Sequence, residues 1–372
     1  MINKKRLIRN FMDLVRIDSP SKQEAAVVKR VKADLKKLGL KPVEDNAGKK
    51  FGGSAGNVFA TLNGTVPGAP VIFLNAHLDT VSPGRGIKPR RRGGYIESDG
   101  TTILGADNKA GVAIILEVLR FIRENDVPRG DIKAVFTVSE EIGLYGAKYM
   151  RRKAISADFG LTLDGGEIDE IINRAPSQDN ISARIRGRAA HAGVHPEDGI
   201  NAIKVASHAV SSMKLGRIDP ETTANIGIIK GGVATNIIPD LVKLKGEARS
   251  HSIKKLARQV DHMKRKFSSA CKKFGARLEM KRTSAYRSFF VSGRDPLLKL
   301  AVKSARLAGI KPRVVATGGG SDANIFNAMG IPTIIIGTGA DRVHTTKERV
   351  SVRQMVQSVR FVIEIIREAS NA

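Results

Sequence analysis

Short apolar runs and helical repeats alternate toward both ends of the chain. Strand-like runs cover residues 58–62, 71–75, 133–138, 159–163 and 332–337. Apolar residues recur at helical spacing in residues 3–17, 23–39, 108–123 and 143–151. Strands that alternate with helices are typical of a parallel sheet covered by helices on both faces. We therefore predict an α/β fold with a mostly parallel, twisted sheet for these regions.

The middle of the chain follows a different order. Strand-like patterns occupy residues 181–187, 225–229, 242–249 and 277–282, and helical spacing marks residues 199–213 and 252–274. This β-α-β-β-α-β order predicts an inserted α+β domain with a four-stranded antiparallel sheet. Patterns that suit the first sheet resume after Pro296. We therefore predict one domain built from residues 1–176 and 287–372, with the inserted domain at residues 177–286.

Composition excludes several kinds of site. Cys271 is the single cysteine among 372 residues, so neither an intramolecular disulfide nor a cysteine-based zinc site can form. No apolar run reaches the roughly 18 residues of a membrane-spanning helix. The first residues indicate an amphipathic helix rather than a signal peptide. We therefore expect a cytoplasmic protein without a membrane partner.

The net charge of +27 has two interpretations. It could serve an acidic partner such as nucleic acid or a membrane surface, or it could reflect a general bias of the source organism. The basic residues are dispersed, and the chain has no tryptophan and only four tyrosines, with no aromatic residues set among the basic runs for base stacking. This distribution favours the second interpretation, and we predict no nucleic-acid partner.

Ionisable residues gather where the strand-like runs end. They are His77, Asp79, Glu140, Glu141, Asp164 and His344, and Asp107 opens the helical segment at 108–123. Each has an ordinary explanation by itself, as part of a solvated strand end or, for Asp107, as a helix N-cap. Ligand sites in open α/β sheets lie beyond the carboxyl ends of the strands, so we expect the set to converge. Two histidines and several carboxylates suit divalent ions such as zinc, with one of the adjacent glutamates as ligand and the other as general base.

With these motifs, the sequence resembles the co-catalytic zinc peptidases, the family that includes peptidase T, carboxypeptidase G and the aminoacylases. The resemblance covers nearly the whole chain and implies two divalent metal ions, zinc by default, with cobalt or manganese as possible substitutes. It implies that Asp107 bridges the ions and that its peptide bond to Asn108 is cis. The implied ligand sets are His77 and Asp164 for one ion, and Glu141 and His344 for the other. Asp79 would orient His77, and Glu140 would act as general base and then as acid.

The inserted domain carries further motifs of the family. Residues 187–193, GRAAHAG, resemble its lid motif, which implies that His191 stabilises the oxyanion. The resemblance also implies that Asn236 and Arg249 hold the substrate. The glycine-rich loop with Gly319, Gly320 and Ser321 would lie near it. The insertion is expected to act as a lid and as the surface of a homodimer.

Residues 139–148, SEEIGLYGAK, and 161–166, LTLDGG, resemble the peptidase T branch most. We therefore expect an exopeptidase, with an aminopeptidase that acts on tripeptides or other short peptides as the favoured form. A carboxypeptidase or an N-acyl amino acid deacylase would carry the same metal centre and remains an alternative. A third alternative is a non-catalytic binding protein on the same fold.

Overall fold

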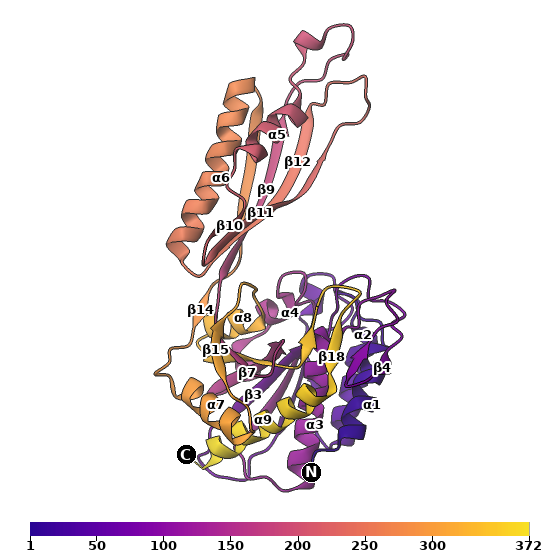
Figure 1. Ribbon diagram of the computed structural model, residues 1–372, viewed down its shortest axis with the longest axis vertical. Helices are drawn as coiled ribbons and strands as arrows, with labels where there is room; N and C mark the ends of the chain where they lie inside the picture. The colour runs from indigo at the N-terminus through magenta and orange to yellow at the C-terminus, as the bar shows by residue number, and fades with distance from the viewer. Residues whose placement is uncertain (372) are drawn as a thin grey trace. The chain divides into compact units, whose positions relative to one another are not determined.

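The computed structural model describes residues 1–371, which form two compact units. The first unit contains residues 1–174 and 290–316 and the chain from Ser321 onward. The second contains Ala175–Phe289 and Thr317–Gly320. Both units are drawn in Figure 1, and each is described here by itself.

The first unit is built on a nine-stranded sheet. Its central strands are β6 (Ile132–Thr137), β3 (Ile72–His77), β7 (Phe159–Gly165) and β16 (Thr333–Gly337), and neighbours among them pair in parallel. The outer strands are β1 (Val43–Glu44), β2 (Val58–Leu62), β8 (Glu170–Ala175), β14 (Phe289–Phe290) and β15 (Arg313–Ala316). β2 and β8 join the central strands in antiparallel fashion. The predicted mostly parallel sheet is therefore confirmed, with antiparallel pairing toward its edges.

Helices cover both faces of this sheet. They are α1 (Lys4–Val15), α2 (Ala25–Lys37), α3 (Ala106–Glu124), α4 (Tyr145–Tyr149), α7 (Pro296–Leu307), α8 (Asp322–Ala328) and α9 (Val352–Ser370), with short 3₁₀ turns at Gly48–Lys50 and Arg152–Ile155. The helix α3 packs on β3 and β7 and is itself covered by α1 and α9. Because it is enclosed on several sides, nearly all of its residues between Ala106 and Leu119 are buried.

The opposite face of the sheet carries α4 and α8. Side chains alternate between the two faces along a strand, and Phe73 of β3 points to this side. Its ring meets Phe326 of α8 edge to face, with the ring centroids 4.8 Å apart. Val135, Ala147 and Ile331 belong to the same buried cluster.

A second, small sheet in this unit escaped prediction. It consists of β4 (Arg90–Arg92), β5 (Tyr95–Glu97), β18 (Arg349–Ser351) and β17 (Ala340–Asp341). Strands of two or three residues are too short to show a periodic pattern. The sheet matters for function because it holds both ends of the segment that carries His344.

The second unit has one antiparallel sheet of five strands. The order is β10 (Gly216–Asp219), β11 (Thr222–Gly231), β12 (Leu241–Ser250), β9 (Ser177–Arg186) and β13 (Arg277–Tyr286). The four predicted strands are present, and the short β10 adds a fifth by forming a hairpin with β11. The inserted α+β architecture is therefore confirmed, with one strand more than predicted.

Two helices, α5 (Ala202–Ser211) and α6 (Ile253–Phe274), pack on that sheet, and a 3₁₀ turn covers Pro196–Asp198. The helix α6 begins at Ser252, whose side chain accepts the backbone N–H of Lys255, and ends at Gly275 in the left-handed conformation. Leu256, Val260, Met263 and Phe267 recur at helical spacing and are buried against the sheet. The charged residues of α6 lie on its other face. Within residues 1–371, no helix is both long and apolar enough to cross a membrane.

Candidate metal centre

His77 is the last residue of β3 and its side chain is buried. Its Nδ1 atom lies 3.0 Å from the backbone carbonyl oxygen of Asp79, which can only accept a hydrogen bond. Nδ1 therefore carries a ring proton, which leaves Nε2 as the atom that can bind either a second proton or a metal ion. Nε2 lies 2.9 Å from Oδ1 of Asp107 and 3.5 Å from Oδ1 of Asp164.

Asp107 lies at the start of α3, where the backbone is not yet helical. The Asp107–Asn108 peptide bond is cis, as the family resemblance implied. Gly111 lets α3 approach β7, because a Cβ atom there would lie 2.3 Å from the carbonyl oxygen of Leu163. The carboxylate of Asp107 faces two histidines: Oδ1 faces His77, and Oδ2 lies 3.3 Å from Nε2 of His344. This arrangement is the one that a bridging ligand requires.

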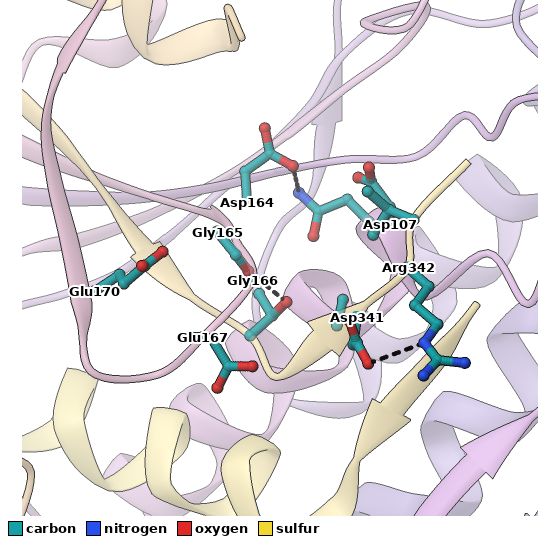
Figure 2. A pocket seen from close by; sticks show the side chains of 12 residues that line it. Asp107, Asp164, Gly165, Gly166, Glu167, Glu170, Asp341 and Arg342 are labelled. Carbon is teal, nitrogen blue, oxygen red and sulfur yellow. Dashed lines mark hydrogen bonds and ion pairs between the residues drawn. The ribbon is translucent and has the colours of Figure 1, made fainter. Parts of the chain in front are cut away.

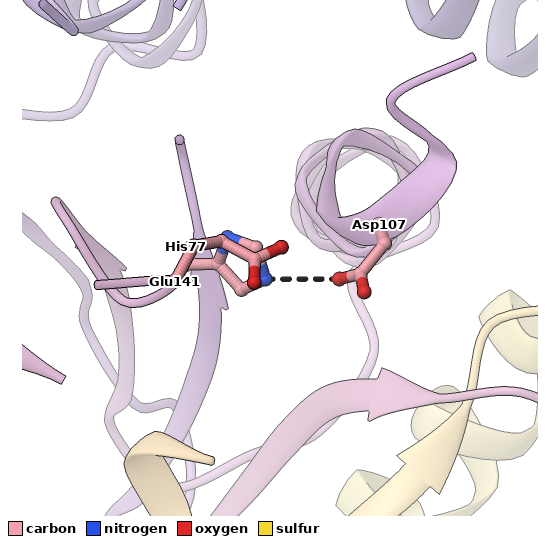
Figure 3. Close-up of side chains that lie close together, drawn as sticks. All are labelled: His77, Asp107 and Glu141. Carbon is pink, nitrogen blue, oxygen red and sulfur yellow. Dashed lines mark hydrogen bonds and ion pairs between the residues drawn. The ribbon is translucent and has the colours of Figure 1, made fainter. Parts of the chain in front are cut away.

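Glu141 follows β6 and completes a second group of ligand atoms. Its Oε1 atom lies 3.1 Å from Nε2 of His344. His77, Asp107 and Glu141 each offer a ligand atom, and these atoms lie within 4.8 Å of one another (Figure 3). The structure thus brings residues from β3, α3 and the loop after β6 to one place.

Asp164 lies on β7, and its carboxylate is held by α3. Oδ1 accepts a hydrogen bond from Nδ2 of Asn108 at 3.0 Å. Oδ1 of Asn108 in turn accepts the backbone N–H of Gly111 at 3.2 Å. Asn108 therefore sets the position of Asp164, a function that the sequence analysis missed because nothing distinguishes this asparagine from a helix-capping residue.

The electrostatics of the cluster fit divalent cations. Burial raises the pKa of Asp164 to about 7, and the nearby charge of Asp107 adds to the effect. Hydrogen bonds with Asp107 and Glu141 raise the pKa of His344 to about 10. Carboxylates crowded together away from water are stabilised in their charged form by cations. Two imidazoles and three carboxylates form a donor set suited to zinc-like ions.

Asp79 and Glu140 lie beside these ligands. Asp79 is fully buried, and its Oδ2 atom accepts hydrogen bonds from Ser21 Oγ at 2.6 Å and from the backbone N–H of Glu141 at 3.2 Å. Burial raises the pKa of Glu140 well above its ordinary value, and the charge of Asp164 adds to this while His77 opposes it. Glu140 is therefore a carboxyl group that readily holds a proton.

The turn before Glu140 depends on residues near the N-terminus. Ser139 has a positive φ of 53°. Its hydroxyl donates to Oε1 of buried Glu24 at 2.6 Å and accepts the backbone N–H of Lys22 at 3.0 Å. Glu24 was not among the predicted site residues, since its contact with Ser139 spans 115 positions and leaves no local signal in the sequence.

A cavity of about 250 Å³ adjoins the ligands. Asp107 and Asp164 line it together with Glu167, Asp341 and Arg342 (Figure 2). Asp341 forms ion pairs with Arg342 and Arg349, which offset part of the negative charge of the cavity lining. The cavity gives a small molecule access to the two aspartates.

The second unit holds most of the other predicted residues. His191 is exposed, and its Nδ1 atom accepts the backbone N–H groups of Gly193 and Val194 at 3.2 Å each. The carbonyl of Asn236 accepts the N–H of Ala192 at 2.9 Å, so the loops of His191 and Asn236 are joined. Arg249 lies on β12, away from these loops in sequence, and donates to Glu247 at 2.7 Å.

The glycine-rich loop spans the boundary between the units. Gly319 and Gly320 belong to the second unit and Ser321 to the first. A Cβ atom on Gly320 would lie 2.1 Å from the ring of Tyr286, so this position requires glycine. Ser321 caps α8, because its side chain accepts the backbone N–H of Ala323 at 3.2 Å.

The chain is similar to known proteins both in sequence and in structure. A sequence model of peptidase family M20/M25/M40 matches residues 73–368. YqjE of Bacillus subtilis, itself described as uncharacterized, is 43% identical over 371 residues, which is 100% of either chain.

Two solved structures are similar along the full length. The aminopeptidase PepT from Bacillus cereus is 42% identical, with a TM-score of 0.89 over 99% of both chains. A tripeptidase from Staphylococcus aureus is 41% identical, with a TM-score of 0.95 over 100% of both chains.

Proposed function

The chain belongs to peptidase family M20/M25/M40, and from this premise we propose that it is a metal-dependent aminopeptidase that releases the N-terminal residue of tripeptides or other short peptides. One observation carries the proposal: the ligand-type side chains converge in a chain that is 41% identical, end to end, to a tripeptidase. Its family membership makes it a metallopeptidase that acts on peptides. The finer choice of an aminopeptidase over a carboxypeptidase or a deacylase is supported by the tripeptidase and by PepT.

We propose that the site holds two divalent ions, with zinc as the native metal. Asp107 would lie between them, because its two oxygens face different histidines. His77 and Asp164 would complete one site, and Glu141 and His344 the other. Such ions polarise a carbonyl group and increase the acidity of water.

Glu140 is proposed as the general base and acid. It is adjacent to the proposed ligand Glu141, and its backbone is anchored on Asp79. From this position its carboxylate takes a proton from the attacking water and then gives that proton to the leaving amine. Asp79 keeps His77 in the tautomer that presents Nε2 to the metal.

The second unit is proposed to supply the remaining groups. Since Nδ1 of His191 accepts two backbone N–H groups, the neutral ring carries its proton on Nε2, which is the form that donates to an oxyanion. Asn236, Arg249 and the loop of Gly319, Gly320 and Ser321 would hold the substrate. We propose that the insertion at residues 177–286 closes as a lid and forms the surface of a homodimer, and that the enzyme is cytoplasmic.

A panel of small peptides tests this function. The protein, reconstituted with zinc, is given Ala-Ala, Ala-Ala-Ala, Ala-Ala-Ala-Ala, N-acetylated Ala-Ala-Ala and N-acetylalanine, each with and without a chelator. We expect chelator-sensitive release of alanine from the free tripeptide and none from the blocked peptide. Cleavage of the blocked substrates would instead assign the enzyme to the carboxypeptidases or deacylases. No cleavage, together with salt-sensitive retention on a nucleic-acid column, would indicate a binding protein.

A further inference from the structure

Glu348 is a buried carboxylate that none of the proposed steps uses. Its exposure is 1%, and it lies just before β18, four residues after His344. Both of its oxygens contact the backbone of the loop that carries Asp107. Oε2 accepts the N–H groups of Leu104 and Gly105 at 2.7 Å each, and Oε1 accepts the N–H of Asp107 at 2.9 Å.

This loop cannot hold its own conformation through helical hydrogen bonds. N–H groups at the start of a helix have no partner within the helix. Gly105 is in the left-handed conformation with φ of 73°, and Asp107 and Asn108 have non-helical dihedral angles. A carboxylate that accepts three N–H groups makes charge-assisted hydrogen bonds, which are stronger than neutral ones. Glu348 therefore supplies the restraint that the loop lacks.

Glu348 is itself fixed. Its backbone N–H donates to the carbonyl of Thr345 at 3.1 Å. The next residue, Arg349, donates to Asp341 at 2.9 Å and stacks on the ring of Tyr95 at 4.4 Å. The segment that leads back to His344 is thus anchored, and the carboxylate of Glu348 connects it to the loop of Asp107.

We propose that Glu348 is a positioning residue of the metal centre, which sets the backbone of Asp107 relative to His344 so that Asp107 faces both histidines. The inference rests on the proposed metal site. It goes further by assigning the spacing of two ligands to a residue that binds neither metal nor substrate. Partners that orient metal ligands typically change metal affinity by about 10- to 100-fold when they are removed.

The test compares Glu348→Gln with Glu117→Gln. A glutamine at 348 has one acceptor oxygen, and its NH₂ group would face backbone N–H donors, so three hydrogen bonds cannot all form. Glu117 is an equally buried carboxylate of the same unit, but it pairs with Arg6 at 2.8 Å, away from the ligand loops. The control therefore removes a buried charge and lowers stability without touching the metal site.

Metal affinity is measured by titration of the metal-free proteins with Zn²⁺ against a competing chelator, and the visible spectrum of bound Co²⁺ reports the coordination geometry. We expect Glu348→Gln to lower the affinity for at least one ion by about 10- to 100-fold and to alter the Co²⁺ spectrum. Glu117→Gln should bind both metal ions with the affinity of the wild type, even if its melting temperature falls as far as that of Glu348→Gln. Glu348→Asp keeps both oxygens on a shorter side chain and should recover part of the affinity. If the glutamine variant does not fold, the metal affinity of Glu348→Asp is compared with that of the wild type instead.

Two results would overturn the inference, and they have different consequences for the proposed function. If the wild type binds two ions and both Glu348 variants bind them with unchanged affinity and spectrum, Glu348 is only a structural cap, and the proposed function stands. If the wild type binds no metal, the inference fails together with the proposed metal centre.

Discussion

Oδ1 of Asp79 accepts a hydrogen bond from the backbone N–H of Glu140 at 2.9 Å. The other oxygen of this carboxylate accepts the backbone N–H of Glu141. The backbone carbonyl of Asp79 accepts a hydrogen bond from Nδ1 of His77. One residue therefore orients a proposed ligand on β3 and fixes the turn after β6 that presents the proposed base and a further ligand. The two strands are neighbours in the sheet, which is why so short a side chain reaches both.

Replacement of the Asp79 side chain should disturb the turn that carries Glu140 and Glu141, while the backbone carbonyl that accepts the His77 proton is kept. We expect Asp79→Asn to lower metal affinity by about 10- to 100-fold through Glu141 and to lower kcat through Glu140, because the amide nitrogen cannot accept an N–H group. Metal titration and steady-state kinetics measure the two effects. Asp34→Asn is the control, since Asp34 is buried but pairs with Arg30 far from the ligands. A variant with full activity and unchanged metal binding would show that the turn of Glu140 and Glu141 does not depend on the Asp79 carboxylate.

Replacement of Glu140 should separate chemistry from metal binding. We expect Glu140→Ala to lower kcat by at least about 100- to 10,000-fold, the usual contribution of a general base. Its metal content, measured by elemental analysis, should equal that of the wild type because Glu140 is not a proposed ligand. Near-normal turnover in this variant would show that another group accepts the proton.

Replacement of His191 should lower kcat without loss of metal. Removal of one oxyanion donor typically costs about 100- to 1,000-fold in kcat, and His191→Ala should fall in this range with the same metal content as the wild type. His195→Ala is a matched control, because His195 is also an exposed loop histidine of the second unit, beside Glu197. Equal losses in both variants would argue against a specific function for His191.

Removal of metal should abolish activity and lower stability together. A ligand at 100 times its Kd stabilises the folded state by about 2.7 kcal/mol, and the buried carboxylates lose their counter-ions when the metal leaves. We expect the metal-free protein to melt at a lower temperature in calorimetry and to regain both activity and stability with zinc. Cobalt or manganese should restore activity as well. Activity that survives exhaustive chelation would contradict the proposed mechanism.

Gly320→Ala should destabilise the second unit. The added Cβ would meet the buried ring of Tyr286, whose hydroxyl donates to Gln178 at 2.7 Å. Overpacking of this kind costs roughly 1–3 kcal/mol, which chemical denaturation would detect. Gly318→Ala is the control, because no atom lies within 4 Å of a Cβ atom built there. Equal stability of the two variants would mean that the ring of Tyr286 moves aside at little cost.

Several features followed from the sequence because they depend on local patterns. The apolar runs of β3, β6 and β7 identified buried parallel strands, and the residues directly after such strands share one edge of the sheet. For this reason His77 and Glu141 could be expected to meet although 64 positions separate them. The antiparallel insertion was predictable for the same reason, since alternation along β9 and helical spacing along α6 are local properties.

Only the tertiary structure decided which residues hold these groups in place. The hydrogen bonds that Glu348 accepts from the loop of Asp107 cross more than 240 positions, and the one that Glu24 accepts from Ser139 crosses 115. A buried carboxylate with such partners looks the same in sequence as a solvated one, because its environment is created by segments far away along the chain. The short strands β10 and β17 were hidden for another reason, because so few residues cannot show an alternating pattern. The sequence therefore determined where the ionisable groups emerge, and the folded chain determined how they are oriented.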